Sequence, residues 1–325
     1  MERPLVSLAL SAYNQRRFVA EAVESALAQT YSPLEVLLSD DASTDGTFDI
    51  MKEMAAAYRG PHKVILNRNR TNNGTAQHIN RQIELLAGVV YVGMAGDDVS
   101  LPERTEKSMQ AFLVGGGRVQ CVWTNATYVD DRGQETGSYQ PDGFQGLHNR
   151  AMPVISMRRH PWVLGATSTY LMTVFREFGA LDSRIMQEDR ALSLRAALRG
   201  EVHYLPSRLV RYRRHGNNVY DYEKQSCEST MGLARDLDNK IGLARQAMKD
   251  CMLAKTRGWI SAREADFYWW SNCRILLAEG VVRHGLLGRN FRGKRFAIKA
   301  ASKLRARLLK LDDSARARVF GVVAE

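Results

Sequence analysis

The sequence has few cysteines, no long hydrophobic run and no Walker-type nucleotide-binding motif. Its 325 residues include four cysteines and no CxxC pair, which argues against a disulfide framework or a zinc site and favours buried thiols in a reducing compartment. No apolar run approaches the roughly 20 residues that span a bilayer. The first residues lack the apolar segment and cleavage site of a signal peptide. The absence of GxxxxGK[ST] argues against a P-loop NTPase. We therefore expect a cytoplasmic protein.

The first hundred residues alternate between two kinds of apolar pattern. Short runs rich in β-branched residues predict strands, and apolar positions at helical spacing predict helices between them. The predicted strands are residues 5–12, 34–38, 64–66 and 89–92, and the predicted helices are residues 17–29, about 44–58 and about 76–87. Ser43 or Thr44 is expected to cap the second helix. This β-α-β alternation favours a parallel sheet with right-handed crossovers.

The remaining chain predicts less regular structure and then a helical region. A helix over residues 103–113, a strand over 119–128 and a polar loop over 130–150 follow, and the loop is long enough for a functional lid. A short helix is expected at 191–198, and a brief strand precedes the basic segment 210–218. Beyond Tyr222 the pattern is helical, which indicates an accessory region.

Two adjacent carboxylates, Asp97 and Asp98, follow the strand at residues 89–92. We expect the strand to break at Gly93 and a helix to restart near Pro102. In an open parallel sheet, ligands bind beyond the carboxyl ends of the strands, where this pair would lie. Neighbouring carboxylates repel each other, and a divalent cation relieves that repulsion. The alternative is an acidic turn that caps the next helix.

Five segments resemble glycosyltransferase family 2 in order and spacing, over about residues 4–220. They are VSLALSAYNQRRFVAEAVESALAQTYSPLEVLLSDDASTDGT, NNGTAQHINRQIELLAGVVYVGMAGDD, GATSTYLMTVFREFGALD, QED and YRRHGNN. The resemblance implies a GT-A fold, an α/β architecture with a Rossmann-like nucleotide-binding, mostly parallel sheet flanked by helices. It would occupy residues 1–221, with a nucleotide-sugar half (1–100) and an acceptor half (101–221), and residues 222–325 would form the helical, basic accessory region.

The same resemblance implies an inverting sugar transfer from a UDP- or dTDP-sugar to a hydroxyl of a glycan or a lipid-linked acceptor. Such a transfer requires a neutralised diphosphate leaving group, a deprotonated acceptor hydroxyl and in-line positioning of the two. Mn²⁺ or Mg²⁺ bridging a carboxylate and phosphate oxygens supplies the first requirement.

On the donor side, the resemblance assigns Asp41 to the uracil ring. A carboxylate at a strand end can accept the imide N–H of the base, although a helix-capping turn is the alternative. The expected nucleoside pocket comprises Ser11, Ala12, Tyr13 and Asn14, with Tyr13 against the base unless it is a core-edge residue. Asn73 and Gly74 are expected to close over the nucleotide.

The resemblance also assigns the metal, the diphosphate and the base. Asp98 is the preferred metal ligand, with Asp97 and His215 as further ligands. Family members often carry an aspartate where this chain has Ala95, so it stays open which of Asp97 and Asp98 binds metal and which meets the ribose.

Asp97, Arg213 and Arg214 are expected at the nucleotide, the two arginines as donors to the diphosphate. Asp189 is the expected general base, with a helix-capping acid as the alternative.

The last 35 residues carry much of the net charge of +11, with ten Lys or Arg against three Asp or Glu. From Arg292 to Leu311 one apolar stripe recurs at helical spacing, which predicts a basic amphipathic helix for an anionic membrane surface. Peripheral attachment to the inner face of the membrane would follow, and an oligomer interface is the alternative. Two other classes stay open: a non-catalytic nucleotide-sugar-binding protein and a metal-dependent nucleotidyltransferase. A nucleic-acid binder would leave the acidic pairs unexplained.

Overall fold

The computed structural model describes residues 3–139, 163–215, 230–269 and 272. Its contacts divide the chain into two compact units. The first consists of Met1–Leu181 and Gln187–Asp221, and the second of Asp182–Met186 and Tyr222–Glu325.

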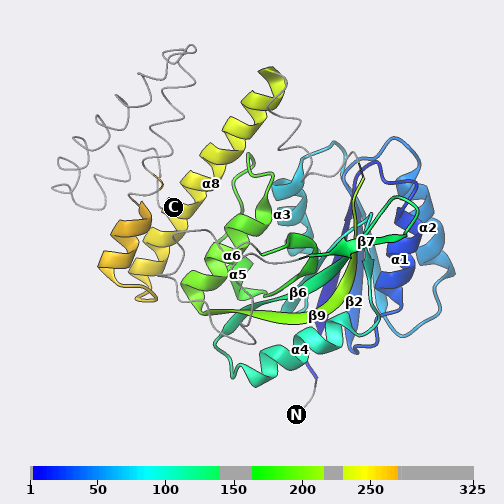
Figure 1. Ribbon diagram of the computed structural model, residues 1–325, viewed down its shortest axis with the longest axis horizontal. Helices are drawn as coiled ribbons and strands as arrows, with labels where there is room; N and C mark the ends of the chain where they lie inside the picture. Colours follow the sequence, from blue (N-terminus) through cyan, green and yellow to red (C-terminus); the bar gives the residue numbers. More distant parts are fainter. Residues whose placement is uncertain (1–2, 140–162, 216–229, 270–271, 273–325) are drawn as a thin grey trace. The chain divides into compact units, whose positions relative to one another are not determined.

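The first half of the first unit is a parallel α/β sheet, as the alternating pattern predicted. Its strands lie in the order β3-β2-β1-β4, and each neighbouring pair runs parallel. Helices flank this sheet (Figure 1). The elements in chain order are β1 (Val6–Ala12), α1 (Val19–Leu27), β2 (Leu34–Asp40), α2 (Thr47–Ala57), β3 (Lys63–Arg68), α3 (Thr75–Leu85) and β4 (Val90–Ala95). All seven residues of β2 are buried, because strands in the middle of such a sheet are covered on both faces.

The second half extends the sheet with mixed directions. The strand order continues β4-β8-β6-β9-β5, with β8 antiparallel to both of its neighbours and β9 parallel to β6. The elements are β5 (Val99–Ser100), α4 (Arg104–Val114), β6 (Val119–Val129), β7 (Glu135–Ser138), η2 (Gly165–Thr167), β8 (Ser168–Leu171), α5 (Thr173–Arg176), α6 (Glu188–Arg199) and β9 (Glu201–Arg213). β5 pairs with the end of β9, so residues near 213 lie beside those near 97.

Three local predictions were wrong. β4 does not break at Gly93 but continues to Ala95, because it stays paired with β1 as far as Ser11. The N-cap of α2 is Gly46, at φ 92°, rather than Ser43 or Thr44. The strand before the basic segment is not brief, because β9 spans 13 residues and pairs with both β6 and β5.

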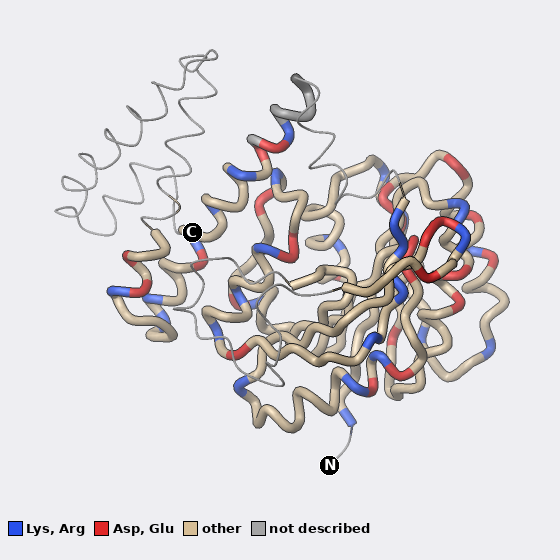
Figure 2. Tube along the Cα trace, viewed as in Figure 1, with Lys and Arg blue, Asp and Glu red and all other residues tan. Residues whose placement is uncertain are grey.

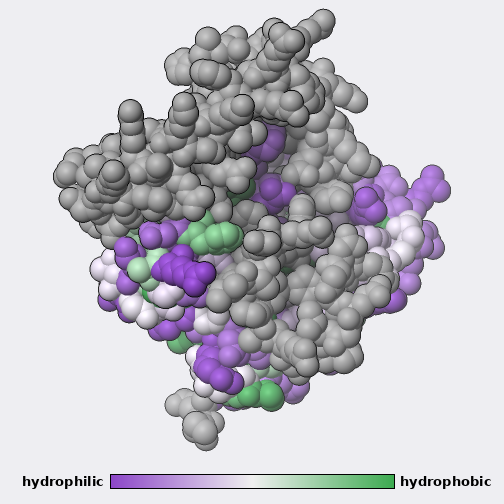
Figure 3. Space-filling view, turned by 60° about the vertical axis from the view of Figure 1, so that its left-hand side comes forward, coloured by the Kyte–Doolittle hydropathy of each residue, from purple (hydrophilic) through white to green (hydrophobic). Residues whose placement is uncertain are grey.

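Apolar side chains from the strands and flanking helices form the core of the first unit. Its members come from β1, β2, β4, β6, α1, α2 and α4 and from the loop at Tyr31, and fully buried examples are Leu8, Leu10, Val23, Val36 and Val92. In Figure 2 the central strands are mostly tan, and the charged residues lie mainly on helices and loops. On the face shown in Figure 3 the described surface is largely hydrophilic or neutral, with small hydrophobic spots.

The described part of the second unit is helical, with the short segment Asp182–Met186 bound to its long helix α8 (Thr230–Thr256). Asn239 Oδ1 accepts the N–H of Met186 (2.9 Å), and Gln246 Oε1 accepts the N–H of Asp182 (2.9 Å). The two amide side chains are seven residues apart and therefore share one face of α8. No helix among the described residues is long and apolar enough to cross a membrane.

Some sequence predictions concern parts of the chain outside the described residues. Cys121 and Cys251 are buried free thiols, as expected, but Cys227 and Cys273 lie outside the described ranges. The same holds for most of the predicted lid and for the whole basic tail from Arg292 to Leu311.

Candidate active site

The acidic pair Asp97–Asp98 lies beyond the carboxyl end of β4, and both residues are buried. Asp98 Oδ1 accepts the backbone N–H of Arg213 (2.8 Å), whereas Asp98 Oδ2 has no hydrogen-bond donor among the described residues. Burial and the neighbouring Asp97 carboxylate raise the pKa of Asp98 well above its usual range. A buried carboxylate with an unsatisfied oxygen is costly to folding, which indicates a site that a positive group completes.

Arg213 binds the loop that carries Asp97 and Asp98 with both its side chain and its backbone. Its guanidinium donates to Asp97 O (2.9 Å) and Asp130 O (3.0 Å), forms an ion pair with Glu21 and lies over the ring of Phe18. The residue is only 2% exposed. In these contacts the guanidinium of Arg213 binds other groups of the protein. Its predicted contact with the diphosphate of the donor stays a prediction.

His215 follows the end of β9 and lies beside the acidic pair. Its Nε2 lies 2.9 Å from Asp97 Oδ2, and its ring stacks on Phe18 with centroids 5.0 Å apart. At this separation the two side chains hydrogen-bond to each other, which places an imidazole and a carboxylate, two common metal ligands, side by side. No cluster of three or more His, Cys, Asp or Glu side chains among the described residues forms a complete metal cage. Mg²⁺ commonly uses one or two carboxylates together with substrate phosphates, so the residues fit a metal that the substrate helps to bind.

Arg214 lies next to these groups in the chain but points elsewhere. Its N–H donates to Val129 O (2.8 Å), and its guanidinium lies 4.8 Å from the centroid of the Tyr128 ring. The described contacts therefore associate Arg214 with β6.

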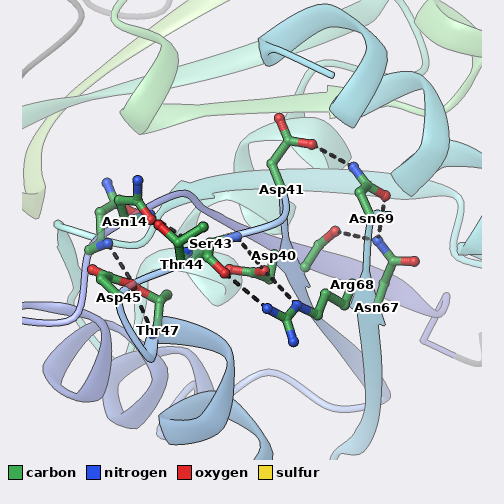
Figure 4. Close-up of polar contacts among 12 residues, drawn as sticks. Asn14, Asp40, Asp41, Ser43, Thr44, Asp45, Thr47, Asn67, Arg68 and Asn69 are labelled. Carbon is green, nitrogen blue, oxygen red and sulfur yellow. Dashed lines mark hydrogen bonds and ion pairs between the residues drawn. The ribbon is translucent and has the colours of Figure 1, made fainter. Parts of the chain in front are cut away.

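Asp41 follows the carboxyl end of β2 and is held by three N–H donors. Asn69 Nδ2 donates to Oδ1 (2.7 Å), and the backbone N–H groups of Asn73 and Gly74 donate to the carboxylate at 3.0–3.2 Å. Figure 4 shows Asp41 directed towards Asn69, and Asn67 lies next to Asn69 on the side away from Asp41. The structure thus brings together Asp41, Asn73 and Gly74, three of the residues predicted for the donor side.

Four more of the predicted pocket residues lie at the end of β1. The Ser11 hydroxyl accepts a hydrogen bond from Gln82 (2.8 Å), and Ala12 O accepts the N–H of Asp41 (2.9 Å). Tyr13 is 46% exposed, so it is a surface residue rather than a core one. Asn14 has φ 52° and binds the loop after β2 through Ser43 and Thr44.

A neighbouring residue, Asp45, is structural. Its carboxylate accepts hydrogen bonds from the N–H of Thr47 (3.0 Å) and from the N–H of Arg16 (3.0 Å). Burial opposes its ionisation, but these hydrogen bonds prevail and lower the pKa of Asp45. The contacts with Thr47 are drawn in Figure 4. They fix the first turn of α2.

The predicted base, Asp189, lies in the first turn of α6 beside Glu188. Gly165 packs against both, since a Cβ at that position would lie 3.2 Å from Asp189 Cβ and from Glu188 Oε1. Burial and the Asp189 carboxylate raise the pKa of Glu188 to about 8. The pKa of Glu188 therefore lies in the range in which a general acid or base works near neutral pH.

The phenol of Tyr212 is influenced by both acidic pairs. Burial raises the pKa of its phenol, and the carboxylates of Asp98, Asp97 and Asp189 add to that rise. All three carboxylates influence this one phenol, so the loop after β4 and the start of α6 both lie within electrostatic range of Tyr212.

Sequence reasoning missed several residues that shape this site. Phe18 and Glu21, at the start of α1, contact His215 and Arg213 respectively. Arg104 is fully buried, and its positive charge opposes the rise in the pKa of Asp98. None of them has a sequence signal, because the contacts join positions that are far apart in the chain. The hydrophobic stripe of α1 indicated only that part of this helix faces the core.

Comparison with known proteins places these features in a family. The family pattern of glycosyl transferase family 2 matches residues 7–165. The Bacillus subtilis protein EpsE, named as a glycosyltransferase, is 40% identical over 130 residues, which are 40% of this chain and 46% of that protein. The chain thus spans about half the length of this relative.

Two solved structures resemble the fold. Residues 1–349 of S. aureus TarS in complex with UDP-GlcNAc give a TM-score of 0.55 at 16% identity, covering 84% of this chain and 81% of TarS. The mannosyltransferase PcManGT from Pyrobaculum calidifontis, in complex with GDP-Man and Mn²⁺, gives 0.56 at 13% identity, covering 94% and 87%. At such identities the likeness concerns the fold alone, and the predicted GT-A fold is confirmed.

Proposed function

Because the chain belongs to glycosyltransferase family 2, we propose that this glycosyltransferase moves a sugar, with inversion, from a UDP- or dTDP-sugar to a glycan or lipid-linked hydroxyl. The observation that carries the proposal is the buried pair Asp97–Asp98, in which Asp98 Oδ2 has no donor among the described residues. A second pair of carboxyl groups, Glu188 and Asp189, supplies the acid–base function that transfer requires.

The donor diphosphate would bind beside Asp97 and Asp98. These carboxylates, with His215, are the residues that would hold a divalent cation, Mn²⁺ or Mg²⁺, together with phosphate oxygens. Bound there, the cation would neutralise the leaving diphosphate. Support comes from the 2.9 Å separation of Asp97 Oδ2 and His215 Nε2 and from the unsatisfied oxygen of Asp98. PcManGT was solved with Mn²⁺.

The nucleoside would bind at the ends of β1 and β2. Asp41 can accept the imide N–H of uracil or thymine while the three N–H groups on its oxygens keep the carboxylate oriented. The exposed ring of Tyr13 is available for stacking on the base. TarS binds UDP-GlcNAc, which favours a uridine carrier.

The reaction is a single displacement. The acceptor oxygen attacks the anomeric carbon as the bond from that carbon to the diphosphate oxygen breaks, and the hydroxyl proton passes to a carboxylate. We assign that role to Asp189, with Glu188 as the coupled partner whose raised pKa keeps a proton within the pair near neutral pH. The products are the inverted glycoside and the nucleoside diphosphate.

The test is a panel of nucleotide sugars with Mn²⁺, Mg²⁺ or chelator, measuring thermal stabilisation and release of nucleoside diphosphate. We expect one uridine or thymidine donor to stabilise the protein and to be slowly hydrolysed only with metal. Stabilisation without turnover in the presence of candidate acceptors would identify a non-catalytic binder, and release of pyrophosphate from a nucleoside triphosphate would identify a nucleotidyltransferase. A product with retained anomeric configuration would refute single displacement.

Asp189→Asn distinguishes the base from the donor site. Loss of a general base costs roughly 10²–10⁴-fold in turnover, and donor affinity should stay unchanged because the base acts on the acceptor. Glu188→Gln is the matched variant. If Asp189→Asn keeps its turnover and Glu188→Gln loses it, the base is Glu188.

The location of the protein stays a sequence-based proposal. The stripe from Arg292 to Leu311 lies outside the described residues, and its binding to the inner membrane face, or to a second copy of the chain, rests on its charge and periodicity.

A further inference from the structure

The strands β4 and β8 separate next to the acidic pair. Their antiparallel pairing includes Val92 opposite Thr169 and continues no further. The next residues, Gly93 and Ser168, therefore present carbonyl groups that no strand partner satisfies across this gap. A buried carbonyl needs a donor, so something must occupy the point where the strands part.

The guanidinium of Arg104 occupies that point. Its Nη2 donates to Gly93 O (2.7 Å) and to Ser168 O (3.3 Å), and its Nη1 donates to Ser100 Oγ (2.8 Å). The side chain is fully buried, and within the described part of the chain it forms no ion pair. Its Nε has no acceptor there either. A buried cation held by neutral acceptors, two carbonyls and a hydroxyl, rather than by a carboxylate is costly, so general packing does not explain it.

Each of the bridged segments leads to one of the acidic pairs. β4 continues from Gly93 to Ala95, the loop with Asp97 and Asp98 follows, and β5 ends at Ser100. Arg104 therefore binds the chain on both sides of that loop. On the other side, Ser168 directly follows η2, which contains Gly165. Gly165 packs against Glu188 and Asp189.

An arginine suits this place better than any other residue. Its planar fork donates in two directions at once, which a lysine ammonium does not reproduce with fixed geometry. Burial lowers the pKa of Arg104 to about 10, with the Asp98 carboxylate opposing, so the group is still charged at neutral pH. The positive charge of Arg104 also lowers the pKa of Asp98, against the effect of burial.

We propose that Arg104 is a positioning residue that sets the separation between the Asp97–Asp98 loop and the Glu188–Asp189 pair by bridging Gly93 O and Ser168 O. The catalytic part of this proposal rests on the proposed function, because only an in-line displacement needs both pairs at one fixed spacing. Misplacement by about 1 Å can cost roughly 10²-fold in rate.

The experiment compares Arg104→Lys with Arg195→Lys in the full-length protein. Arg195 is an equally buried arginine that also donates to two carbonyls, Gly179 O and Ala180 O, within one loop. It therefore controls for the general cost of replacing a buried guanidinium. Amide hydrogen exchange is measured for peptides covering residues 93–100 and 164–171. UDP release from the hydrolysed donor is measured as kcat and KM, and affinity for UDP with Mn²⁺ by calorimetry.

We expect Arg104→Lys to raise exchange at least threefold in both peptides at once. It should lower kcat roughly 30- to 100-fold and change UDP affinity less than threefold. Arg195→Lys should leave both peptides and kcat within twofold. Ser100→Ala removes the Nη1 contact and the bond from the hydroxyl to Met94 Sδ (3.5 Å) but leaves both carbonyl contacts of Arg104 in place. It is the milder variant if Arg104→Lys does not fold, with a three- to tenfold lower kcat expected.

Two results would overturn the proposal. One is faster exchange in only one of the two peptides, since a bridge must loosen both. The other is a kcat for Arg104→Lys and Ser100→Ala that equals the wild-type value or matches that of Arg195→Lys. If the wild-type protein hydrolyses no donor, the proposed function fails, and the exchange measurement still decides whether Arg104 joins the two segments.

Discussion

Two acidic residues lie at the ends of the strands on either side of β1, Asp41 after β2 and Asp98 after β4, and they have opposite surroundings. Asp41 accepts hydrogen bonds from three N–H groups, one from a side chain and two from the backbone. Asp98 accepts one, from Arg213, and its second oxygen has no donor in the described part of the chain. Both residues are buried, so exposure to water does not account for the difference.

The difference indicates what each carboxylate binds. A carboxylate offers about four acceptor positions, so Asp41 with three donors has room for one more N–H group, such as that of a pyrimidine base. Asp98 has too few donors to pay for its burial, and the adjacent Asp97 makes ionisation harder still. Such a group is stabilised most by a cation. Under the proposed function, the protein itself orients the Asp41 carboxylate for the nucleoside, whereas metal and substrate would complete the site at Asp98.

The largest expected effect comes from Asp98→Asn, which removes the charge but keeps the shape. We expect metal-dependent UDP binding to be lost and turnover to fall by about 10³-fold, since a metal ion contributes several kcal/mol of charge stabilisation. Calorimetry with UDP, with and without Mn²⁺, measures the first effect. The metal-free variant should also be more stable than the wild type, because the buried repulsion with Asp97 is gone.

The control for this variant is Asp131→Asn, which removes an exposed carboxylate that pairs with Arg17. Exposed pairs contribute roughly 0–1 kcal/mol, so its melting temperature and UDP binding should match the wild type. Unchanged metal dependence in Asp98→Asn would refute the assignment of Asp98, and a lower melting temperature would contradict the account of its burial.

The next effect concerns pH. It tests whether the pKa of Glu188 is raised by burial and a neighbouring carboxylate, as that of Asp98 is. The pKa of Glu188 is about 8 in the folded protein and near 4.5 when unfolded. Between these values the folded state holds more protons, so the stability contribution is fully present below pH 4.5 and is lost as pH rises towards 8. Thermal melts of metal-free protein from pH 5 to 8.5 should show this decline, and Glu188→Gln should reduce it. Equal slopes in the two proteins would contradict the raised pKa.

The sequence predicted the parallel half of the sheet and the carboxyl-end acids well, because both depend on local patterns. The strand of residues 34–38 is apolar except for Glu35. Asp41 follows β2 directly, and Asp98 lies just beyond the end of β4. The residue that caps α2 was harder to predict. Ser43 and Thr44 have good capping side chains, but the Ser43 hydroxyl accepts the N–H of Asn14 and the backbone N–H of Thr44 donates to Asn14 Oδ1. Asp45 stabilises the first turn of α2 instead.

The supporting contacts of the site were not predictable from one sequence. Arg213 was expected at the diphosphate because of the basic segment that contains it, whereas its described contacts are with Asp97, Asp130 and Glu21. These contacts depend on β9 pairing with β5, a two-residue strand that no periodicity reveals. Arg104 gives no signal either, since a helical arginine in a charged stretch normally indicates a solvent-exposed face.

The smallest expected effect comes from Asn69→Ala, which removes one of the three donors on Asp41. A hydrogen bond to a charged group contributes about 1.5–3 kcal/mol, and the backbone donors of Asn73 and Gly74 would compensate in part. We therefore expect UDP affinity to fall roughly tenfold, which corresponds to about 1.4 kcal/mol. The dependence of binding on Mn²⁺ should stay as in the wild type, because the metal ligands are untouched.

The matched control is Thr71→Ala in the same loop, where the hydroxyl donates to Asn73 Oδ1 (3.2 Å) and the side chain is exposed. Its UDP affinity should stay within twofold of the wild type. If Asn69→Ala binds UDP as tightly as Thr71→Ala does, Asp41 is not oriented by Asn69 for the base. If Asn69→Ala also loses its response to Mn²⁺, the two carboxylate sites are coupled, and the contrast between a protein-completed and a substrate-completed site fails. A loss confined to UDP affinity would support separate roles, because only the nucleoside end of the donor depends on Asp41.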